Sequence, residues 1–277
     1  MRIQLASSAF VWLICCSVQA GIINVPDDQP TIQLAINAAN PGDVVIVAEG
    51  EYFENINFFG KAITVRSTDP TDPAVVMNTI INGGGSGTVV ACTNGEGANT
   101  VLSGLVITNG NGNPGGGGMF NGGSSPTVTN CTFSGNSAGQ GGGMINNSSS
   151  PTVTNCILWD GIRNGDSSPT VSFSDVQGGL GAGTTNGGGN INADPLFVDD
   201  LRLSAGSPCI DAGDNTAVPA GITTDLDGNP RFVDDLDTPD TGNPEGVNPI
   251  VDMGVFESHG TDGLARGSRT TSRYSVQ

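Results

Sequence analysis

The chain has 277 residues and a formal net charge of −18, because 27 acidic residues stand against nine Lys and Arg. A general binder of nucleic acid, or of anionic lipid surfaces, is disfavoured because contacts with phosphates need a basic face. Glycine contributes 43 residues and aromatic residues only 5 %. This composition excludes collagen, which needs glycine at every third position, and indicates a thin, repetitive β-structure rather than a broad compact core.

Residues 1–20 are predicted to be a secretory signal peptide. Arg2 supplies the positive start, and residues 9–18 form an apolar run that is too short for a membrane helix of about 20 residues. Residues 18–20 (Val-Gln-Ala) form a small-residue cleavage site before Gly21. We therefore expect a secreted or cell-surface protein whose mature chain has no transmembrane segment.

A lipoprotein signal is the alternative interpretation of this leader. It would be acylated at Cys15 or Cys16, but the residues just before them, Ile14 and Cys15, fit a lipobox poorly. Simple cleavage after residue 20 is the prediction that we carry forward.

The first predicted element of the mature chain is a helix over residues 31–39. Pro30 stands just before it, and residues 40–42 (Asn-Pro-Gly) end it. Four small or apolar residues share one face of this helix: Ile32, Ala35, Ile36 and Ala39. We expect the helix to close the N-terminal end of the structure, with the first coil starting at residues 43–47 and further strands near 55–58 and 62–66.

The middle of the chain is an internal repeat. Residues 116–131 read GGGMFNGGSSPTVTNC and residues 141–156 read GGGMINNSSSPTVTNC, which is an offset of 25 with 13 of 16 positions identical. A partial copy lies at 168–174, and a degenerate copy at 100–109 precedes the first. Periods of 20–50 residues are typical of solenoids and other repeat architectures.

Each repeat contains short alternating strands separated by Gly, Asn, Ser and Pro turns, and such a unit cannot bury its apolar side alone. Coils stacked at about 4.8 Å can do so, because each strand pairs with its copies in the neighbouring coils. Equivalent residues should then form ladders: Val128, Val153 and Val171 in one, Met119 and Met144 in another. Asn130 and Asn155 should stack at a turn with left-handed backbone angles, where their side chains can bond from coil to coil.

Four cysteines remain after removal of the leader: Cys92, Cys131, Cys156 and Cys209. An even number in an exported protein suggests disulfides. Cys131 and Cys156 hold the same place in successive coils, so their Cα atoms should lie about 4.8 Å apart, which permits a bridge. A stacked pair points in parallel, however, so a buried ladder of thiols is favoured over a disulfide, and both readings remain open.

Residues 194–257 differ in composition from the repeats. They hold 14 acidic residues against Arg202 and Arg231, and we expect an acidic C-terminal cap that follows a β-helix over residues 21–193. Residues 258–277 form a weakly basic tail that we expect to be disordered.

Several segments resemble known families. Residues 25–66 resemble the opening of right-handed parallel β-helix proteins of the pectin-lyase-like group. Residues 133–136 (FSGN) and 142–145 (GGMI) resemble the repeats of polymorphic outer membrane proteins. The C-terminal segments look like the choice-of-anchor Q pattern: 194–198 (DPLFV), 201–203 (LRL), 206–213 (GSPCIDAG), 225–231 (DLDGNPR) and 251–257 (VDMGVFE).

The resemblance implies an exported or surface-displayed β-helix. Its relatives include polysaccharide lyases, esterases and hydrolases, as well as members without known activity. A lyase of this kind typically needs a basic residue and a Ca²⁺ ion held by carboxylates. Here Arg163 lies in sequence near Trp159, Asp160 and Asp166. We interpret this stretch as a solvated loop rather than a catalytic site.

Other candidate chemistry is sparse in the sequence. The acid pairs Asp199-Asp200 and Asp234-Asp235 lie in the cap segment, away from the coil faces on which an inverting glycosidase would place its carboxylates. Both are interpreted as structural turns. The single histidine, His259, begins the tail, so triad or zinc chemistry has almost no support.

Asp225, Asp227 and Asn229 place oxygen ligands at alternate positions around Gly228, as loops that bind hard cations do. We retain them as a candidate Ca²⁺ site, with a turn stabilised by side-chain hydrogen bonds as the alternative.

The sequence thus predicts an all-β protein, a right-handed parallel β-helix of roughly seven coils at about 24 residues per coil, with an N-terminal helical cap and an acidic C-terminal cap. The expected function is a non-catalytic extracellular scaffold that binds glycan or a surface protein. A polysaccharide lyase or glycoside hydrolase, and a pure adhesin-like passenger, are the alternatives.

Overall fold

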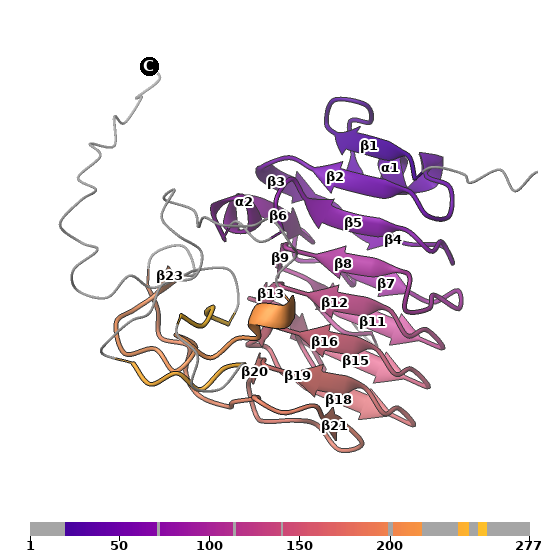
Figure 1. Cartoon of the computed structure of the whole chain (residues 1–277). Coiled ribbons are helices and arrows are strands. Elements are labelled where there is room, and N and C mark those ends of the chain that lie inside the picture. Colours follow the sequence, from indigo (N-terminus) through magenta and orange to yellow (C-terminus); the bar gives the residue numbers. More distant parts are fainter. Residues whose placement is uncertain are drawn as a thin grey trace, which may run out of the picture.

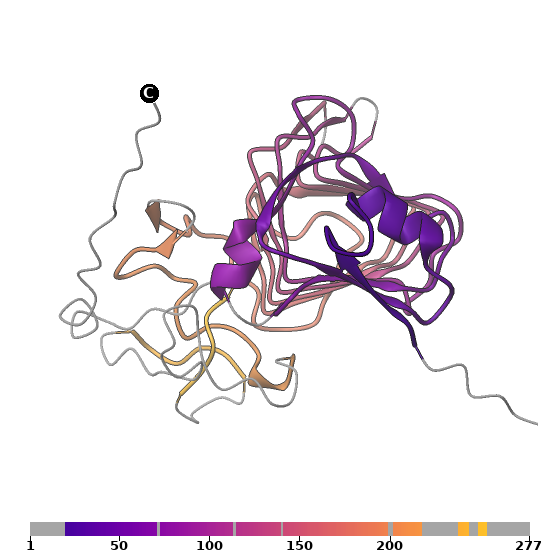
Figure 2. The same cartoon turned by 90° about the horizontal axis from the view of Figure 1, so that it is seen from above.

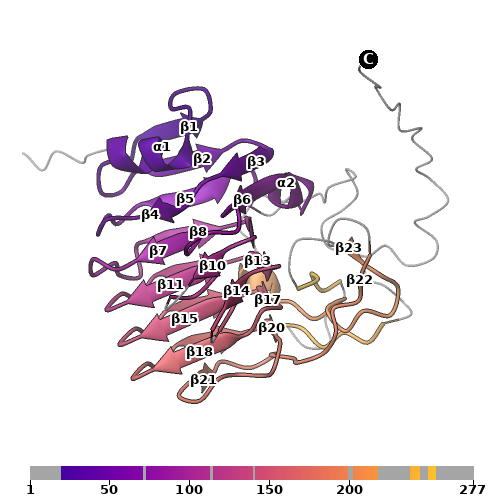
Figure 3. The same cartoon turned by 180° about the vertical axis from the view of Figure 1, so that it is seen from behind.

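The computed structural model describes residues 20–70, 73–112, 115–139, 141–198, 202–217, 238–243 and 249–253. In these residues the chain winds into a stack of coils, shown from the side in Figure 1 and from behind in Figure 3. Three all-parallel sheets run along the stack, and we call them faces 1, 2 and 3. The fold is the expected all-β parallel β-helix.

The described strands of the three faces are as follows. Face 1 is an eight-stranded sheet: β1 (Ile22–Val25), β2 (Val44–Val47), β5 (Thr64–Ser67), β8 (Val101–Ser103), β12 (Thr127–Thr129), β16 (Thr152–Thr154), β19 (Thr170–Ser172) and β21 (Thr185–Asn186). Face 2 has six strands: β3 (Gly50–Phe53), β6 (Thr79–Asn82), β9 (Val106–Thr108), β13 (Thr132–Ser134), β17 (Ile157–Leu158) and β20 (Asp175–Val176). Face 3 has five: β4 (Ile56–Asn57), β7 (Val90–Cys92), β11 (Met119–Gly122), β15 (Met144–Asn147) and β18 (Ile162–Gly165).

The smaller described elements complete the set. A short parallel pair, β10 (Asn111–Gly112) and β14 (Ser137–Ala138), lies in the connections that lead from face 2 to face 3. An antiparallel pair, β22 (Phe197–Val198) and β23 (Arg202–Leu203), begins the C-terminal segment. The helices are α1 (Ile32–Ala38), α2 (Pro73–Asn78) and the 3₁₀ turn η2 (Asn215–Ala217).

The register of face 1 confirms the ladders that the repeat predicts. Val128 pairs with Val153, and Val153 pairs with Val171. On face 3, Met119 pairs with Met144. All five side chains are fully buried in one continuous core inside the coils, which explains how units with so few aromatic residues fold: each apolar side chain packs on its copy one coil away.

The last coils are shorter than those of the repeat. Equivalent residues lie 25 positions apart between β12 and β16 and 18 apart between β16 and β19. The step from Thr170 of β19 to its partner Thr185 of β21 is 15 residues. The eight described strands of face 1 give seven coil-to-coil steps.

At the corner between faces 1 and 2, the expected left-handed backbone is confirmed, but the expected side-chain bonding is wrong. Asn130 and Asn155 have φ values of 51° and 52°, in the left-handed region that asparagine tolerates. We expected their side-chain amides to bond to each other, but Asn155 pairs with the backbone of Asp214 instead. Asn155 Nδ2 donates to Asp214 O at 3.2 Å, and Asp214 N donates to Asn155 Oδ1 at 3.0 Å.

Amide bonding between coils occurs inside face 3 instead. Asn121 Nδ2 donates to Asn146 Oδ1 at 2.8 Å, and Asn146 Nδ2 donates to Asn164 Oδ1 at 2.9 Å. Asn164 Nδ2 in turn donates a hydrogen bond to Thr184 Oγ1 at 2.7 Å. Asn121 and Asn146 are fully buried, so each bond satisfies groups that water does not reach.

The FSGN motif has a structural role at the corner between faces 2 and 3. Phe133 fills the core, and Asn136 links three coils. Asn136 Nδ2 donates to Ile107 O at 2.8 Å, while Asn136 Oδ1 accepts from Gly110 N at 3.0 Å. Asn136 N donates to Asp160 Oδ2 at 2.8 Å in the next coil. The motif therefore holds coils together by satisfying buried backbone groups.

Helix α1 closes the N-terminal end, as Figure 2 shows in the view down the stack. Ile32, Ala35 and Ile36 are buried against the first coil. Both carboxylate oxygens of Glu54 accept backbone N–H groups at the helix start, and Lys61 Nζ donates to three carbonyls at its end, those of Ile36, Asn37 and Ala39. These bonds satisfy backbone groups that a short helix leaves open. Two elements were not predicted: strand β1, which pairs with β2 and precedes the first expected strand, and helix α2.

The described part of residues 194–257 packs along the side of the last coils. Cys209, Ala212 and Met253 cluster with Ile157, whose side chain points outward from face 2. Figure 2 shows this segment and α2 on the same side of the stack. None of the helices in the described part of the chain combines the length and apolar character needed to cross a membrane.

Candidate functional site

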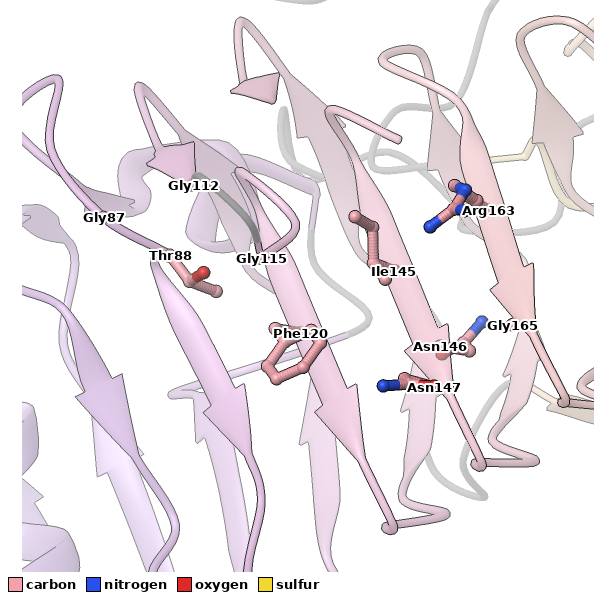
Figure 4. Close-up of a pocket in the computed structure, with 10 residues that line it drawn as sticks. All are labelled: Gly87, Thr88, Gly112, Gly115, Phe120, Ile145, Asn146, Asn147, Arg163 and Gly165. Atoms are coloured by element: carbon pink, nitrogen blue, oxygen red, sulfur yellow. The ribbon is translucent and has the colours of Figure 1, made fainter. Parts of the chain in front are cut away.

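The strongest candidate site is a groove of about 610 Å³ on the outer surface of face 3. It follows from the alternation of the strands: Met119 and Met144 point into the core, so the next residue of each strand points outward. Phe120 of β11 pairs with Ile145 of β15, and Ile145 pairs with Arg163 of β18. Figure 4 shows these three side chains on three neighbouring strands.

The three side chains form a row that changes from apolar to cationic, which we call the Phe120–Arg163 row. Phe120 is half-buried, Ile145 is buried and Arg163 is exposed. Neighbouring strands are about 4.8 Å apart, so the row runs across two strand spacings along the stack. A long molecule lying along the stack would meet the half-buried aromatic ring and the exposed guanidinium, with the buried Ile145 between them.

The Arg163 guanidinium is available to a ligand. Lys61 donates to carbonyls at the end of α1, and Arg66 donates to the carbonyls of Ser67 and Thr68. Within the described residues, by contrast, no hydrogen bond or ion pair engages the Arg163 side chain. A planar group with five N–H donors can bind carboxylate, sulfate or hydroxyl oxygens.

The rim of the groove is made by the glycine-rich connection that precedes β11. Thr88 Oγ1 donates to Gly116 O at 2.7 Å and ties this connection to the neighbouring coil. A Cβ atom at Gly116 would lie 2.1 Å from Met119 O and 2.9 Å from Ile145 N, so a side chain there could not be accommodated. The glycines of the repeat therefore allow the backbone to pack closely beside the Phe120–Arg163 row.

The side of the groove toward the C-terminal ends of β15 and β18 is polar. Asn147 is exposed at the end of β15, beside Gly165 of β18. The described lining residues thus offer an apolar strip, one cation, two amides (Asn146 and Asn147) and one hydroxyl, which is the combination of apolar surface with few polar groups that is typical of ligand sites. None of these described lining residues is acidic.

The interpretation of Arg163 as part of a solvated loop is wrong, because it lies in strand β18. Its sequence neighbours do not form a site with it. Trp159 packs with the C-terminal segment, and Asp160 accepts hydrogen bonds from Gly135 N and Asn136 N. Burial raises the pKa of Asp160 above its ordinary value, against the lowering effect of these bonds.

Phe120 and Ile145 were missed by the sequence reasoning, although a signal was present. The repeat places Met-Phe at 119–120 and Met-Ile at 144–145, and Ile-Arg at 162–163 follows the second copy after 18 residues. Aligning this third pair with the other two would have assigned all three outward residues to one row.

A second groove of about 410 Å³ lies on face 2 beside α2, lined among others by Met77, Ile80, Val106 and Glu51. Its lining mixes apolar side chains with polar ones such as Asn78 and Thr108, and the described C-terminal segment covers the same sheet further along at Ile157. It lacks a cation, so we regard face 3 as the better candidate.

The predicted Ca²⁺ ligands Asp225, Asp227 and Asn229 lie outside the described residues, as do the acid pairs 199–200 and 234–235 and His259. In the part of the chain that the structure describes, no group of three or more His, Cys, Asp or Glu side chains is placed to hold a metal ion. The Ca²⁺ site stays a prediction.

The fold defines the class of this protein as a parallel β-helix repeat protein. Comparisons with models of known protein families and with curated protein sequences gave no match.

Proposed function

We propose that this protein is an exported or surface-associated β-helix scaffold without catalytic activity, which binds glycan in the groove of face 3. The observation that carries the proposal is the Phe120–Arg163 row with its unengaged guanidinium. Aromatic rings stack on the apolar faces of sugars, and guanidinium groups bind their oxygens. The predicted signal peptide and the resemblance to surface β-helices support the extracellular location.

The groove favours a glycan over a folded protein. Stable protein–protein interfaces bury about 800 Å² on each partner, with a cluster of large apolar anchors at the centre. The Phe120–Arg163 row supplies one half-buried ring in a groove of about 610 Å³. A chain-like ligand needs fewer such anchors than a folded protein.

The test combines a glycan array with a reducing-sugar assay on the purified protein. We expect binding without release of new reducing ends. Phe120→Ala and Arg163→Gln should each weaken binding at least about tenfold, equivalent to 1.4 kcal/mol. Phe53→Ala is the matched control, because Phe53 is 69 % exposed on face 2 and should not affect binding.

Three results would contradict the proposal. Binding that survives both groove variants would place the site elsewhere, and binding to a surface protein but to no glycan would favour the protein-binding reading. New reducing ends or unsaturated products that disappear in Arg163→Gln would favour the polysaccharide lyase or hydrolase alternative.

A further inference from the structure

The start of the described chain makes an unusual contact with a buried carboxylate. Gly21 N donates to Asp43 Oδ1 at 2.7 Å, and Asp43 is only 7 % exposed. The other oxygen, Asp43 Oδ2, accepts from Asn40 N at 2.8 Å. Asp43 thus joins the start of the described residues to the connection between α1 and β2, and it directly precedes strand β2.

A side chain at residue 21 would push the Asp43 carboxylate aside. A Cβ atom at Gly21 would lie 2.9 Å from Asp43 Oδ1, 3.2 Å from Asp43 Cγ and 3.4 Å from Asp43 Oδ2. Gly21 O also accepts from Val44 N at 2.8 Å, so the residue extends the β1–β2 ladder by one bond. The backbone of Gly21 is therefore held on one side by the sheet and on the other by Asp43.

We propose that Gly21 is the first residue of the mature protein and that its α-ammonium group forms an ion pair with Asp43. An export-pathway peptidase would hydrolyse the Ala20–Gly21 bond: water adds across it, Ala20 leaves with a new carboxylate, and the freed amine of Gly21 takes up a proton. The nitrogen that now donates one neutral hydrogen bond would then carry a positive charge at the same place.

The site suits an ammonium better than an amide. Gly21 N already lies 2.7 Å from Asp43 Oδ1, and charge-assisted hydrogen bonds to a carboxylate are roughly twice as strong as neutral ones. Ala20 is exposed, so its removal leaves the new group room for water on its outer side. The fold would therefore be more stable with the leader removed than with it attached.

The charged groups around Gly21 set the sign of the pH dependence. Asp43 faces it directly, and the Lys61 ammonium acts on Asp43 from the end of α1 while bonded to three carbonyls. Asp28 lies further along, bonded to Asn24 N. The amides of Asn40 and Gly21 lower the pKa of Asp43, so it stays ionised at neutral pH.

An α-amino group ordinarily has a pKa of about 7.7–8.0, and the ion pair would raise it in the folded protein. The resulting stability is fully present below about pH 7.7 and is lost as the pH rises through the raised folded value.

The experiment first determines the N-terminus of the exported protein by intact mass, and Gly21 is the expected result. It then compares two purified chains that begin at Gly21 and at Ala20. Both carry one α-ammonium, but in the second it lies one residue away from Asp43. We expect the Gly21 form to melt about 2–4 °C higher at pH 7, and the difference to vanish by about pH 10.

Asp43→Asn made in both chains is the second arm, and it should abolish the difference between them. Gly21→Ala should be exported and cleaved normally but should lack the stabilisation, because its Cβ displaces the carboxylate. A mature N-terminus other than Gly21, or identical melting curves for the two wild-type forms from pH 6 to pH 10, would overturn the proposal. Neither result bears on glycan binding by face 3, so the two proposals can fail separately.

Discussion

Asn121 and Asn146 occupy the same interior position in successive coils of face 3, and Asn121 Nδ2 donates a hydrogen bond of 2.8 Å to Asn146 Oδ1. Asn146 also donates to Asn164, so it makes two bonds of this ladder whereas Asn121 makes one. A buried polar group that loses its partner costs about 1–3 kcal/mol. The loss of stability on substitution should therefore depend on which asparagine of the ladder is changed.

We predict that Asn146→Ala destabilises the protein more than Asn121→Ala. The first change leaves Asn121 Nδ2 and Asn164 Oδ1 without partners, and the second leaves only Asn146 Oδ1. The difference should be about 1–3 kcal/mol, measured by urea unfolding. Equal losses for the two variants would show that the amide ladder does not contribute as its geometry implies.

We predict that shortening one of the stacked valines of face 1 also destabilises the protein. Val153 is fully buried between Val128 and Val171, so Val153→Ala removes two methyl groups and leaves a cavity. We expect a loss of about 2 kcal/mol in the free energy of unfolding. Val198→Ala, at a residue that is 50 % exposed, is the control and should change stability by less than about 0.5 kcal/mol. A small effect at Val153 would contradict the tightly stacked core.

The four described cysteines are all free and buried: Cys92, Cys131, Cys156 and Cys209. Cys131 and Cys156 lie in register without a disulfide, and burial raises the pKa of Cys131 to about 12. The thiolate is the reactive form. We therefore predict no reaction with a thiol reagent in the native protein at pH 8, and four reactive thiols per mature chain after unfolding without reductant. Only two after unfolding would indicate that a bridge forms.

We predict that ionisation of Asp175 weakens the packing of the C-terminal segment against face 2 as the pH rises. It is fully buried, and Cys209 Sγ donates to its Oδ2 at 3.4 Å. Burial raises the pKa of Asp175, more than the bonds from Ala193 and Cys209 lower it, and Asp194 adds to the increase. The folded state then holds the proton more tightly than the unfolded state, so this group favours folding at low pH and loses that contribution as the pH rises above about 4.

Asp175→Asn tests this sign. The variant should gain stability relative to the wild type as the pH rises from 4 to 7, when melting curves of the two proteins are compared at each pH. The comparison with the wild type removes the contribution of carboxylates with lowered pKa, such as Glu96, which change in the opposite direction. A stability difference that does not vary with pH would show that Asp175 titrates normally.

The repeat is the part of the structure that sequence reasoning predicts best. Identical residues 25 positions apart must take equivalent places if each coil stacks on the next, so the pairs Val128–Val153 and Met119–Met144 follow from spacing alone. The helix over 31–39 is also predicted correctly, because its apolar period and its Pro and Gly boundaries are local signals.

The candidate site was missed by this reasoning. Arg163 was considered with Trp159 and Asp160, its neighbours along the chain, but in a parallel stack the side chains that touch are those of adjacent coils. Its partners on the surface are Ile145 and Phe120, 18 and 43 positions earlier. The 18-residue step was recognised for residues 168–174 but was not applied to residues 162–163, so this match was missed.

The sequence by itself therefore determined the stacked coils, their register and the interior ladders, because these depend on a short period repeated along the chain. Only the tertiary structure decided which outward residues meet in the groove, where Asn155 finds Asp214, and how residue 21 meets Asp43. These contacts join segments of unequal spacing through side chains whose partners no local pattern specifies.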